Sequence, residues 1–551
     1  MRDRDDWLVA ALIAAYALFF VVALLLPLGM IVSRSLQDAS GRFVGLANFA
    51  TYFATPALSQ SITNSMFTAA ATTIVVVVLA FTYAYALTRT CMPFKTFFKF
   101  MAMLPLLTPG LLKAIALVYW FGNQGVLKSA LMGHSIYGPI GIVMASALWT
   151  FPHAVIVLST ALLLSDARLY ESAEVMKAGR FRTFRVVTLP GVRYGLISTA
   201  IFVFVLVLTD FGIPKVIGGN FNVLATDIYK EVIGQQNFEM GAVVSVVLLI
   251  PAILAFVIDR MVTRRQVSQL SARSTPYSPK PSPLIDMAML AFCSTIALFS
   301  LAVMGMGQFA ALVKFWPYNL NLTLAHYDFN VEGVGFENFR NSLLLALSVA
   351  TIGSAVVFVG AFIVEKARRD HPMRQVLHAC ALLPMAVPGL VLGLGYLLFI
   401  NQPGNPLGVF YGTLMLLVVN TLTHYYPVAH LTALTALKQM DREFEAVGAS
   451  LKIPLARTFL AVTVPVCSPA ILDIWIYLFL NAMTTISSVI FLYGAHTKLA
   501  SIAVVHMDEA GRLASAAAMA MLIVYVCIIV RVLHVLVSGW LLRSLQRWRT
   551  G

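Results

Sequence analysis

Residues 166–190, DARLYESAEVMKAGRFRTFRVVTLP, recur 275 residues later as residues 441–465, DREFEAVGASLKIPLARTFLAVTVP. The shift pairs Asp166 with Asp441 at the start of the stretch and Pro190 with Pro465 at its end. Between these ends it pairs Met176-Lys177 with Leu451-Lys452, and Arg182-Thr183-Phe184 with Arg457-Thr458-Phe459. Because one pattern occurs twice at a constant shift, we expect the chain to consist of two repeats.

The composition around these stretches is that of a membrane protein. Of the 551 residues, 60% are apolar and only 11% are charged, whereas a soluble domain carries about 25% charged residues. This excludes a cytosolic enzyme, a nucleic-acid-binding protein and a disordered chain. Apolar stretches of about 18 to 25 residues are long enough to cross a bilayer as helices. We therefore predict an all-α polytopic membrane protein with about twelve transmembrane helices, at 7–32, 65–87, 97–121, 138–164, 194–213, 240–262, 285–312, 342–364, 376–400, 411–436, 466–493 and 513–540.

The basic residues indicate the orientation of these spans. The formal net charge is +14, and most Lys and Arg residues fall in the segments that share a side with the N-terminus. Loops rich in Lys and Arg stay in the cytoplasm. We therefore expect both termini to be cytoplasmic, and the first span to be a retained helix because the acidic start at residues 2–6 does not suit a signal peptide.

Two further pairs of motifs define the extent of each repeat. Asn64-Ser65 corresponds to Asn341-Ser342, and Leu104-Pro105 with Pro109-Gly110 corresponds to Leu383-Pro384 with Pro388-Gly389. Each repeat then holds six spans, so the repeats are parallel and a central pathway between them is expected. The predicted division is 1–265, a Ser- and Pro-rich cytoplasmic linker at 266–283, and 284–551. The Pro-Gly pairs should kink or break the third and ninth spans.

Each repeated stretch is expected to form a helix, a turn and a second helix. Asp166 and Asp441 suit the N-cap position of the first helix. Apolar residues then follow at helical spacing, and Gly179 and Pro454 share the column where a helix is interrupted. A single such loop would be taken for a solvated segment. Its recurrence in both repeats predicts that the loops dock onto something in the cytoplasm. The apolar positions are Leu169, Ala173 and Met176 in the first copy and Phe444, Val447 and Leu451 in the second.

These loops resemble the coupling loops of ABC importer permeases, in which a Glu-Ala-Ala start, a Gly and a terminal Pro mark the helix that fits the ATPase subunit. Glu171-Ser172-Ala173 matches the start, and Arg182-Thr183-Phe184 through Pro190 matches the end. The family Gly is replaced by Lys177 in one copy and Lys452 in the other, and Ala446-Val447-Gly448 stands at the second start. The whole chain resembles a fused double permease of the type I importer fold, similar to ferric-iron and phosphonate importers.

The substrate that this resemblance implies is a small phosphonate, 2-aminoethylphosphonate in particular. The stretches that carry it are Asp227 to Gly241, Asn481-Ala-Met-Thr-Thr and Asp508-Glu-Ala-Gly. Ferric iron or another small solute is the alternative.

The resemblance further implies a division of labour among subunits in a bacterial inner membrane. No Gly-x-x-x-x-Gly-Lys-Ser/Thr phosphate loop is present, so ATP and Mg²⁺ should be bound by two copies of a separate ATPase. A periplasmic or lipid-anchored solute-binding protein should deliver the ligand outside. We expect no catalytic residue and no metal site in this chain. The candidate docking residues are Asp166, Glu171, Ala173, Lys177, Gly179, Arg182, Pro190, Asp441, Glu445, Gly448, Lys452, Arg457 and Pro465.

Polar residues within the spans indicate a possible pathway. Asp210 lies near the end of the fifth span, in the column of Thr485 in the eleventh span. A charge at membrane depth is costly, so Asp210 should face protein or water, either meeting a cationic amine, lining a gate or standing at the helix end. The candidate pathway residues are Thr209, Asp210, Asn481, Thr484 and Thr485.

Two other classes of protein are compatible with the span count. A secondary transporter of six plus six helices should have a long central loop and charge motifs between its second and third spans, but that loop covers only 89–99. A membrane enzyme would need a cluster of nucleophiles, carboxylates or metal ligands, and the spans contain no such constellation.

Overall fold

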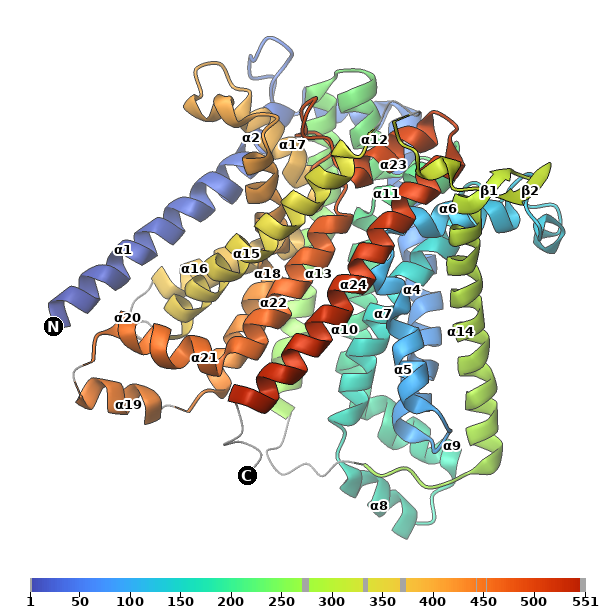
Figure 1. Ribbon diagram of the computed structural model, residues 1–551, viewed down its shortest axis with the longest axis vertical. Helices are drawn as coiled ribbons and strands as arrows, with labels where there is room; N and C mark the ends of the chain where they lie inside the picture. The colour runs from blue at the N-terminus through green and yellow to red at the C-terminus, as the bar shows by residue number, and fades with distance from the viewer. Residues whose placement is uncertain are drawn as a thin grey trace. The chain divides into compact units, whose positions relative to one another are not determined.

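The computed structural model describes residues 2–269, 277–330, 335–366, 373–441, 443–451 and 453–545, and over these ranges the chain is almost entirely helical (Figure 1). The longer helices are α1 (Arg2–Phe20), α4 (Pro56–Arg89), α7 (Pro139–Leu163), α10 (Leu189–Thr209), α13 (Phe238–Gln269), α14 (Pro283–Leu312), α15 (Glu337–Lys366), α18 (Leu414–Gln439), α22 (Ser468–Thr484) and α24 (Leu513–Leu545). A short antiparallel hairpin, β1 (Val313–Phe315) and β2 (Asn319–Leu322), follows α14.

Shorter helices connect these elements. They are α2 (Leu26–Ser35), α3 (Ala47–Ala54), α5 (Lys95–Met103), α6 (Gly110–Phe121), α8 (Ala167–Val175), α9 (Arg180–Thr183), α11 (Gly212–Ile217), α12 (Leu224–Tyr229), α16 (Met373–Leu382), α17 (Gly389–Ile400), α19 (Glu443–Ser450), α20 (Leu455–Thr458), α21 (Val464–Val466) and α23 (Ala500–Glu509). The 3₁₀ turns lie at Leu104–Leu107, Lys128–Leu131, Ala325–Tyr327, Leu383–Ala386 and Pro406–Phe410, and the π-helical turns at Val21–Leu25, Phe184–Thr188, Lys230–Gly234 and Phe459–Thr463.

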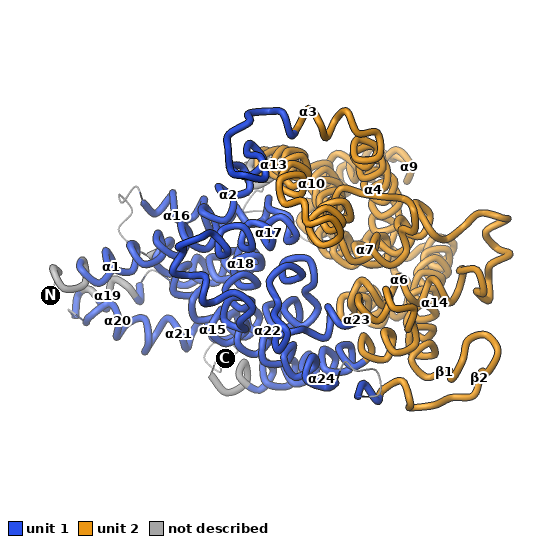
Figure 2. Tube along the Cα trace, turned by 90° about the horizontal axis from the view of Figure 1, so that it is seen from above, with its two compact units in different colours: residues 1–48, 328–503, 522–551 blue, residues 49–327, 504–521 orange. Residues whose placement is uncertain are grey.

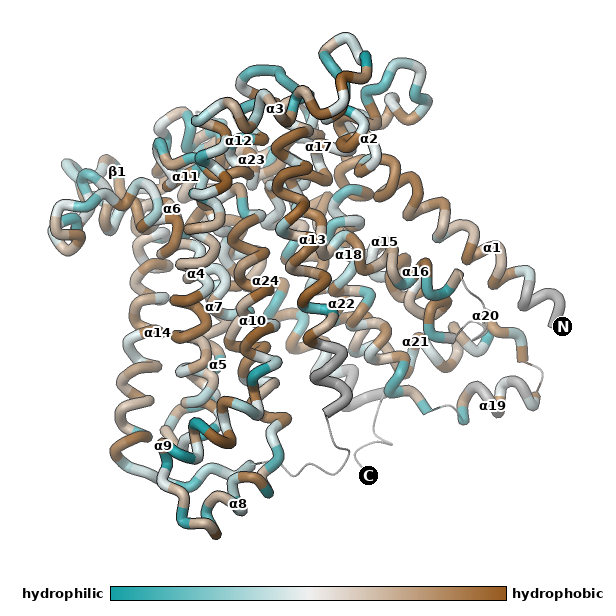
Figure 3. Tube along the Cα trace, turned by 180° about the vertical axis from the view of Figure 1, so that it is seen from behind, coloured by the Kyte–Doolittle hydropathy of each residue, from teal (hydrophilic) through white to brown (hydrophobic). Residues whose placement is uncertain are grey.

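Within the described residues, 8 helices are long and apolar enough to cross a membrane, or up to 11 if each sharply bent pair counts as one span. Figure 3 shows hydrophobic residues along most of α1 and α14, as expected for helices that face lipid. Eleven of the twelve predicted spans thus have a matching helix or bent pair, and the protein is a polytopic all-α membrane protein.

The remaining prediction, the span at 411–436, corresponds to α18, which is long enough but too polar to meet the same criterion. Its side chains of Asn420, Thr421, Thr423 and His430 are fully buried. Helix α18 packs against α15 and α22, so these polar groups face protein rather than lipid, where they would be costly. Its polarity is therefore that of an internal helix.

The Pro-Gly pairs break their spans, as predicted. The segments Lys95–Leu107 and Gly110–Phe121 meet at 100°, and Met373–Ala386 and Gly389–Ile400 meet at 110°. Proline lacks an amide hydrogen and disfavours a helical residue before it, so the helix ends and restarts at this point. At Gly389 a Cβ would lie 2.7 Å from the Ser487 Oγ atom, so any larger residue there would force the Ser487 side chain to move.

The described residues group into two compact units that interleave along the chain (Figure 2). Unit 1 contains residues 1–48, 328–503 and 522–551, and unit 2 contains residues 49–327 and 504–521. The first helices of the N-terminal repeat pack within unit 1, where the Tyr396 hydroxyl donates to the Ala23 carbonyl over 2.6 Å. Helix α14, which opens the second repeat, packs within unit 2, where the Trp120 indole N–H donates to the Ala302 carbonyl over 3.1 Å. The units therefore differ from the linear division of the sequence at 266–283.

Candidate functional site: the two repeated loops

The first repeated loop follows α7 and begins with α8. The Asp166 carboxylate accepts the Arg168 amide hydrogen over 3.1 Å, so it caps the helix N-terminus as predicted. Helix α9 then starts after Gly179, and a π-helical turn at Phe184–Thr188 leads into α10. In Figure 1, α8 and α9 lie at the end of unit 2 opposite the β1–β2 hairpin.

Lysine occupies a left-handed backbone position at the end of α8. The Ala178 amide donates to the Ala173 carbonyl over 2.9 Å, and the Lys177 amide donates to the Glu174 carbonyl over 2.8 Å. These two bonds form a Schellman motif, whose C′ residue is usually glycine because it needs a positive φ. Lys177 has φ 52°. The backbone at Lys177 therefore adopts the left-handed conformation that usually calls for glycine.

The second loop repeats these features one by one in unit 1. The Asp441 carboxylate accepts the Glu443 amide hydrogen over 3.0 Å, at the start of α19. The Ile453 amide donates to the Gly448 carbonyl over 2.9 Å, which corresponds to the bond from Ala178 to Ala173. Helix α20 and the π-helical turn Phe459–Thr463 occupy the same columns as α9 and the turn of the first copy. Lys452 and the side chain of Glu445 lie outside the described residues.

An aromatic residue at the start of each π-helical turn holds the loop against its own unit. In unit 2 the Phe184 ring lies 6.0 Å from the ring centroids of both Phe81 and Tyr85. In unit 1 the Phe459 ring lies 5.8 Å from Phe358 and 4.7 Å from Phe362. Edge and tilted ring contacts at these distances are favourable. The second part of each loop is therefore anchored in the same way.

The first helix of each loop has one small buried residue and several exposed apolar ones. Ala173 is buried, and a Cβ at Gly448 would lie 3.2 Å from the Thr458 Oγ1 atom, so this column faces the following helix. Leu169 and Met176 in the first copy are 54% and 73% exposed, and Leu451 in the second is 66% exposed. Of the predicted apolar positions in the first copy, Ala173 therefore packs inside the loop, whereas Leu169 and Met176 lie on its surface.

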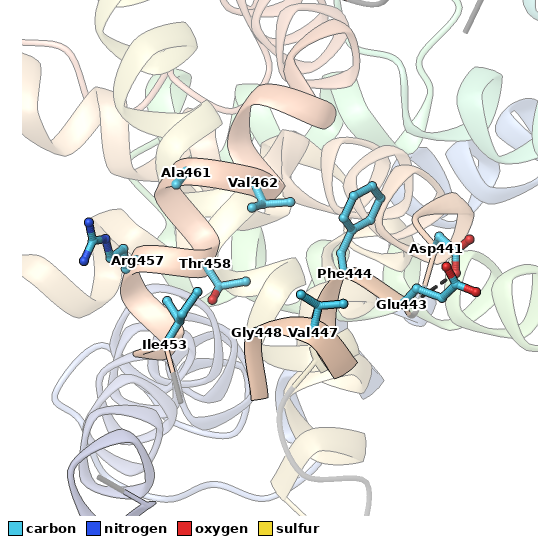
Figure 4. Close-up of a pocket in the computed structure, with 10 residues that line it drawn as sticks. All are labelled: Asp441, Glu443, Phe444, Val447, Gly448, Ile453, Arg457, Thr458, Ala461 and Val462. Carbon is cyan, nitrogen blue, oxygen red and sulfur yellow. Dashed lines mark hydrogen bonds between the residues drawn. The ribbon is translucent and has the colours of Figure 1, made fainter. Parts of the chain in front are cut away.

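The second loop also encloses a hollow of about 420 Å³ between α19 and the segment from α20 to the π-helical turn (Figure 4). Phe444 and Val447 line it from α19, and Asp441 and Glu443 lie at one end. Arg457 and Thr458 belong to the opposite wall. This loop thus presents an apolar concave surface with acidic residues beside it.

The other predicted docking residues lie in the same two loops. Glu171, Lys177 and Arg182 of the first copy and Arg457 of the second are exposed, and they are placed where a partner could reach them. Gly179 is the N-cap of α9. Pro190 and Pro465 lie in the first turns of α10 and α21, where a missing amide hydrogen costs nothing.

Replacing Lys177 by glycine is expected to stabilise α8 by about 1 kcal/mol, because a residue with a Cβ is strained in the left-handed region. Amide hydrogen exchange over residues 170–178 should become slower in this variant, whereas a Lys177→Ala variant, which retains the Cβ, should leave it nearly unchanged. Equal exchange in the glycine and alanine variants would show that the positive φ carries no cost here.

The predicted pathway residues lie at equivalent helix ends in the two units. The Thr209 hydroxyl donates to the Val205 carbonyl over 2.9 Å, and the Thr484 hydroxyl donates to the Leu480 carbonyl over 3.0 Å. Asp210 and Thr485 follow as extended C-cap residues, with ψ 132° and 138°. The Asn481 amide donates to the Tyr477 carbonyl of its own helix over 2.8 Å.

Sequence reasoning assigned no role to Lys113, which structure places near Asp210. Lys113 is 3% exposed, and its ammonium donates to the Thr108 carbonyl over 2.8 Å, beside the Pro109-Gly110 break. Lys113 and Asp210 attract one another electrostatically. The chain itself therefore supplies a buried cation whose charge acts on Asp210. The sequence feature that could have indicated a role for Lys113 is its position within an apolar span, shortly after the Pro109-Gly110 pair.

Two of the three stretches that carry the phosphonate resemblance meet in unit 2. The Tyr229 hydroxyl lies 3.4 Å from the Glu509 carboxylate, which also forms an ion pair with Lys215 at 2.7 Å. Burial, followed by the charge of Glu509, raises the pKa of Asp508 to about 7, while Lys215 acts in the opposite direction. Asp508 lies in α23, outside the candidate membrane spans.

The raised pKa of Asp508 predicts a pH-dependent effect of Asp508→Asn on stability. Between about pH 4 and pH 7 the unfolded chain ionises this carboxyl whereas the folded chain keeps it protonated, so the native aspartate loses stability as pH rises. The gain in the free energy of unfolding from Asp508→Asn should therefore be small at pH 4, grow up to about pH 7 and then level off. Unfolding of both proteins in detergent across this range tests it, and a gain independent of pH would contradict it.

Comparison with known proteins agrees with this architecture. Residues 92–268 match the family described as binding-protein-dependent transport system inner membrane component. Among curated proteins, a ferric transport system permease of Haemophilus influenzae is 26% identical over 91% of this chain and 80% of its own length. A ferric transport system permease of Actinobacillus pleuropneumoniae is 27% identical over 82% of this chain and 67% of its own length.

Shorter matches include a spermidine/putrescine permease of Haemophilus influenzae, 24% identical over 47% of this chain and 95% of its own length. The matched family segment contains α8, α9 and the whole first loop. Residues 92–268 are therefore similar to inner membrane components of binding-protein-dependent transport systems, and the polytopic helical fold is consistent with this similarity.

Proposed function

We propose that this protein is the permease subunit of an ATP-driven, binding-protein-dependent importer, and that each repeated loop docks one copy of an ATPase subunit. The observation that carries this proposal is the duplication of the loop. The same N-cap, the same closing bond at the end of the first helix and the same π-helical turn occur in both units. Both loops also expose apolar side chains on their first helix, as a protein-docking surface requires.

The proposal assigns the remaining parts of the transport cycle to other subunits. ATP and Mg²⁺ would be bound by the ATPase pair, whose closure would move the two loops. A periplasmic or lipid-anchored binding protein would deliver the solute at the outer side of a bacterial inner membrane. Both termini of this chain would then be cytoplasmic, in keeping with the positive-inside rule.

Ferric iron is the first candidate for the transported solute, because three relatives that cover 82% to 91% of this chain are ferric transport permeases. These relatives favour ferric iron, the alternative substrate, over a phosphonate. The second candidate, 2-aminoethylphosphonate, rests on the three stretches quoted above, of which those containing Tyr229 and Glu509 lie together in unit 2.

Uptake into reconstituted vesicles tests both the coupling and the solute. The chain would be purified with its ATPase and supplied with binding protein loaded either with labelled ferric iron or with labelled 2-aminoethylphosphonate. We expect uptake only when ATP is present on the side of the repeated loops. Uptake driven by an imposed ion gradient without ATP would instead indicate a secondary transporter, and the solute that accumulates decides between the two candidates.

A further inference from the structure

The segment that joins the two repeats packs against the first loop. Residues 277–286, which we call the strap, run along unit 2 to the start of α14. The Tyr277 ring lies 4.4 Å from the Tyr170 ring of α8. The Lys280 ammonium bonds the Glu174 carboxylate at 2.6 Å. A segment whose composition predicted an extended linker thus makes specific contacts with α8.

Two further contacts fix the strap on either side of these. The Arg180 guanidinium of α9 donates to the Ser282 hydroxyl over 2.5 Å. The Asp286 carboxylate accepts the Cys91 amide hydrogen over 2.8 Å, in the turn after α4, and the Ser282 amide hydrogen over 2.9 Å. The strap therefore connects both short helices of the first loop with α14 and with the end of α4.

Arg89, the last residue of α4, joins these contacts to the core of unit 2. Its guanidinium lies 4.7 Å from the Tyr277 ring centroid and 5.1 Å from that of Tyr170. It also donates to the Leu162 carbonyl at the end of α7 over 2.5 Å, and the residue is 7% exposed. A buried cation that contacts two aromatic rings is a favourable arrangement. Helix α8 is thus attached to α4 and α7 both directly, through Tyr170, and through the strap tyrosine, whose ring packs on Tyr170.

The second loop has different residues in the columns that receive the strap. Tyr170 corresponds to Glu445, Glu174 to Ala449 and Arg180 to Leu455. An aromatic partner, an acidic partner and a basic partner are each replaced by a residue that cannot make the same contact. The two loops therefore share their backbone caps but not this attachment.

We propose that Tyr277 and Lys280 of the strap are positioning residues for the first loop, which make α8 move as one body with unit 2. Among the residues that the structure describes, the second loop has no such strap. This inference rests on the proposed function, in which the loops transmit ATPase motion. If α8 could turn independently of α4 and α7, closure of the ATPase pair would move only the loop and would not be transmitted to the helices of unit 2. Loosening the strap should then reduce the amount of solute transported per ATP hydrolysed while leaving the ATPase bound.

The first test measures hydrogen exchange of the α8 amides in the full complex. Tyr277→Ala removes the ring contacts, and exchange over residues 170–178 should become about tenfold faster. The conservative Tyr277→Phe should retain the slow exchange. Lys280→Glu should accelerate exchange, and the charge swap Lys280→Glu with Glu174→Lys should restore protection. Tyr318→Ala and Lys314→Ala, at exposed positions of the β1–β2 hairpin, are the matched controls.

The second test measures coupling in vesicles with these variants, as the ratio of ferric iron or 2-aminoethylphosphonate taken up to ATP hydrolysed. We expect Tyr277→Ala to lower this ratio severalfold and the swapped pair to recover it. Unchanged α8 exchange in Tyr277→Ala would overturn the attachment, and faster exchange with an unchanged ratio would overturn the positioning role. Failure of the proposed function would be seen separately, because the wild-type chain would then lack ATP-dependent uptake.

Discussion

Asp210→Thr alone is expected to destabilise the folded protein by about 1 kcal/mol, because it removes a carboxylate whose charge favours the buried Lys113 ammonium. Lys113 is 3% exposed and its ammonium donates to the Thr108 carbonyl. A neutral carbonyl does not replace a carboxylate as the partner of a buried cation. The free energy of unfolding in detergent, measured for wild type and variant at one pH, gives the difference.

The second repeat supplies the matched double variant. Its residues in the columns of Lys113 and Asp210 are Leu392 and Thr485, so the same fold is built there without either charge. Lys113→Leu combined with Asp210→Thr should therefore recover most of the stability lost in Asp210→Thr. Replacing a buried charge pair by apolar or neutral groups is often nearly neutral. A double variant as unstable as Asp210→Thr would show that the two charges do not compensate one another.

Met176→Asp and Leu451→Asp, each made singly, are expected to lower ATP-dependent uptake more than tenfold. The two residues occupy the same column of the repeated loops and are 73% and 66% exposed, so neither substitution should disturb folding. Placing a carboxylate in an apolar docking contact costs about 2 kcal/mol or more at the centre of an interface. Initial uptake rates in vesicles, at equal amounts of inserted permease, provide the measurement.

The control for these substitutions is Met132→Asp, which introduces the same carboxylate at a methionine that is 88% exposed and lies outside both loops. ATP hydrolysis by the complex should remain normal in this variant. If Met176→Asp and Leu451→Asp transport as fast as Met132→Asp, the exposed apolar positions of the loops do not contact the ATPase.

The local structure of the two loops was predictable because the same pattern of capping and helix-breaking residues occurs in both repeats. Asp166 and Asp441 are in cap positions, and Gly179 and Pro454 start the second helices. A capping residue acts on backbone groups within its own turn, so sequence spacing is sufficient to place it. The Pro-Gly breaks were predictable for the same reason, since proline acts on the adjacent backbone.

Features that depend on distant contacts were not predictable in this way. Helix α18 is long enough to be a span, but the sequence did not show that its polar residues are buried against α15 and α22. The packing of α14 within unit 2 and of the strap on α8 joins residues about a hundred or more positions apart. The electrostatic interaction between Lys113 and Asp210 likewise depends on how α6 packs against α11, which follows Asp210. Hydrophobic periodicity does not indicate which distant residues will interact.

The central claim is that both repeated loops bind an ATPase subunit, and copurification of the ATPase with the permease tests it most directly. Wild-type chain and Met132→Asp should retain the ATPase through affinity purification in detergent, whereas a chain carrying both Met176→Asp and Leu451→Asp should lose it while remaining folded. Retention of the ATPase by the folded double variant, at the same ratio to permease as in wild type, would contradict the claim.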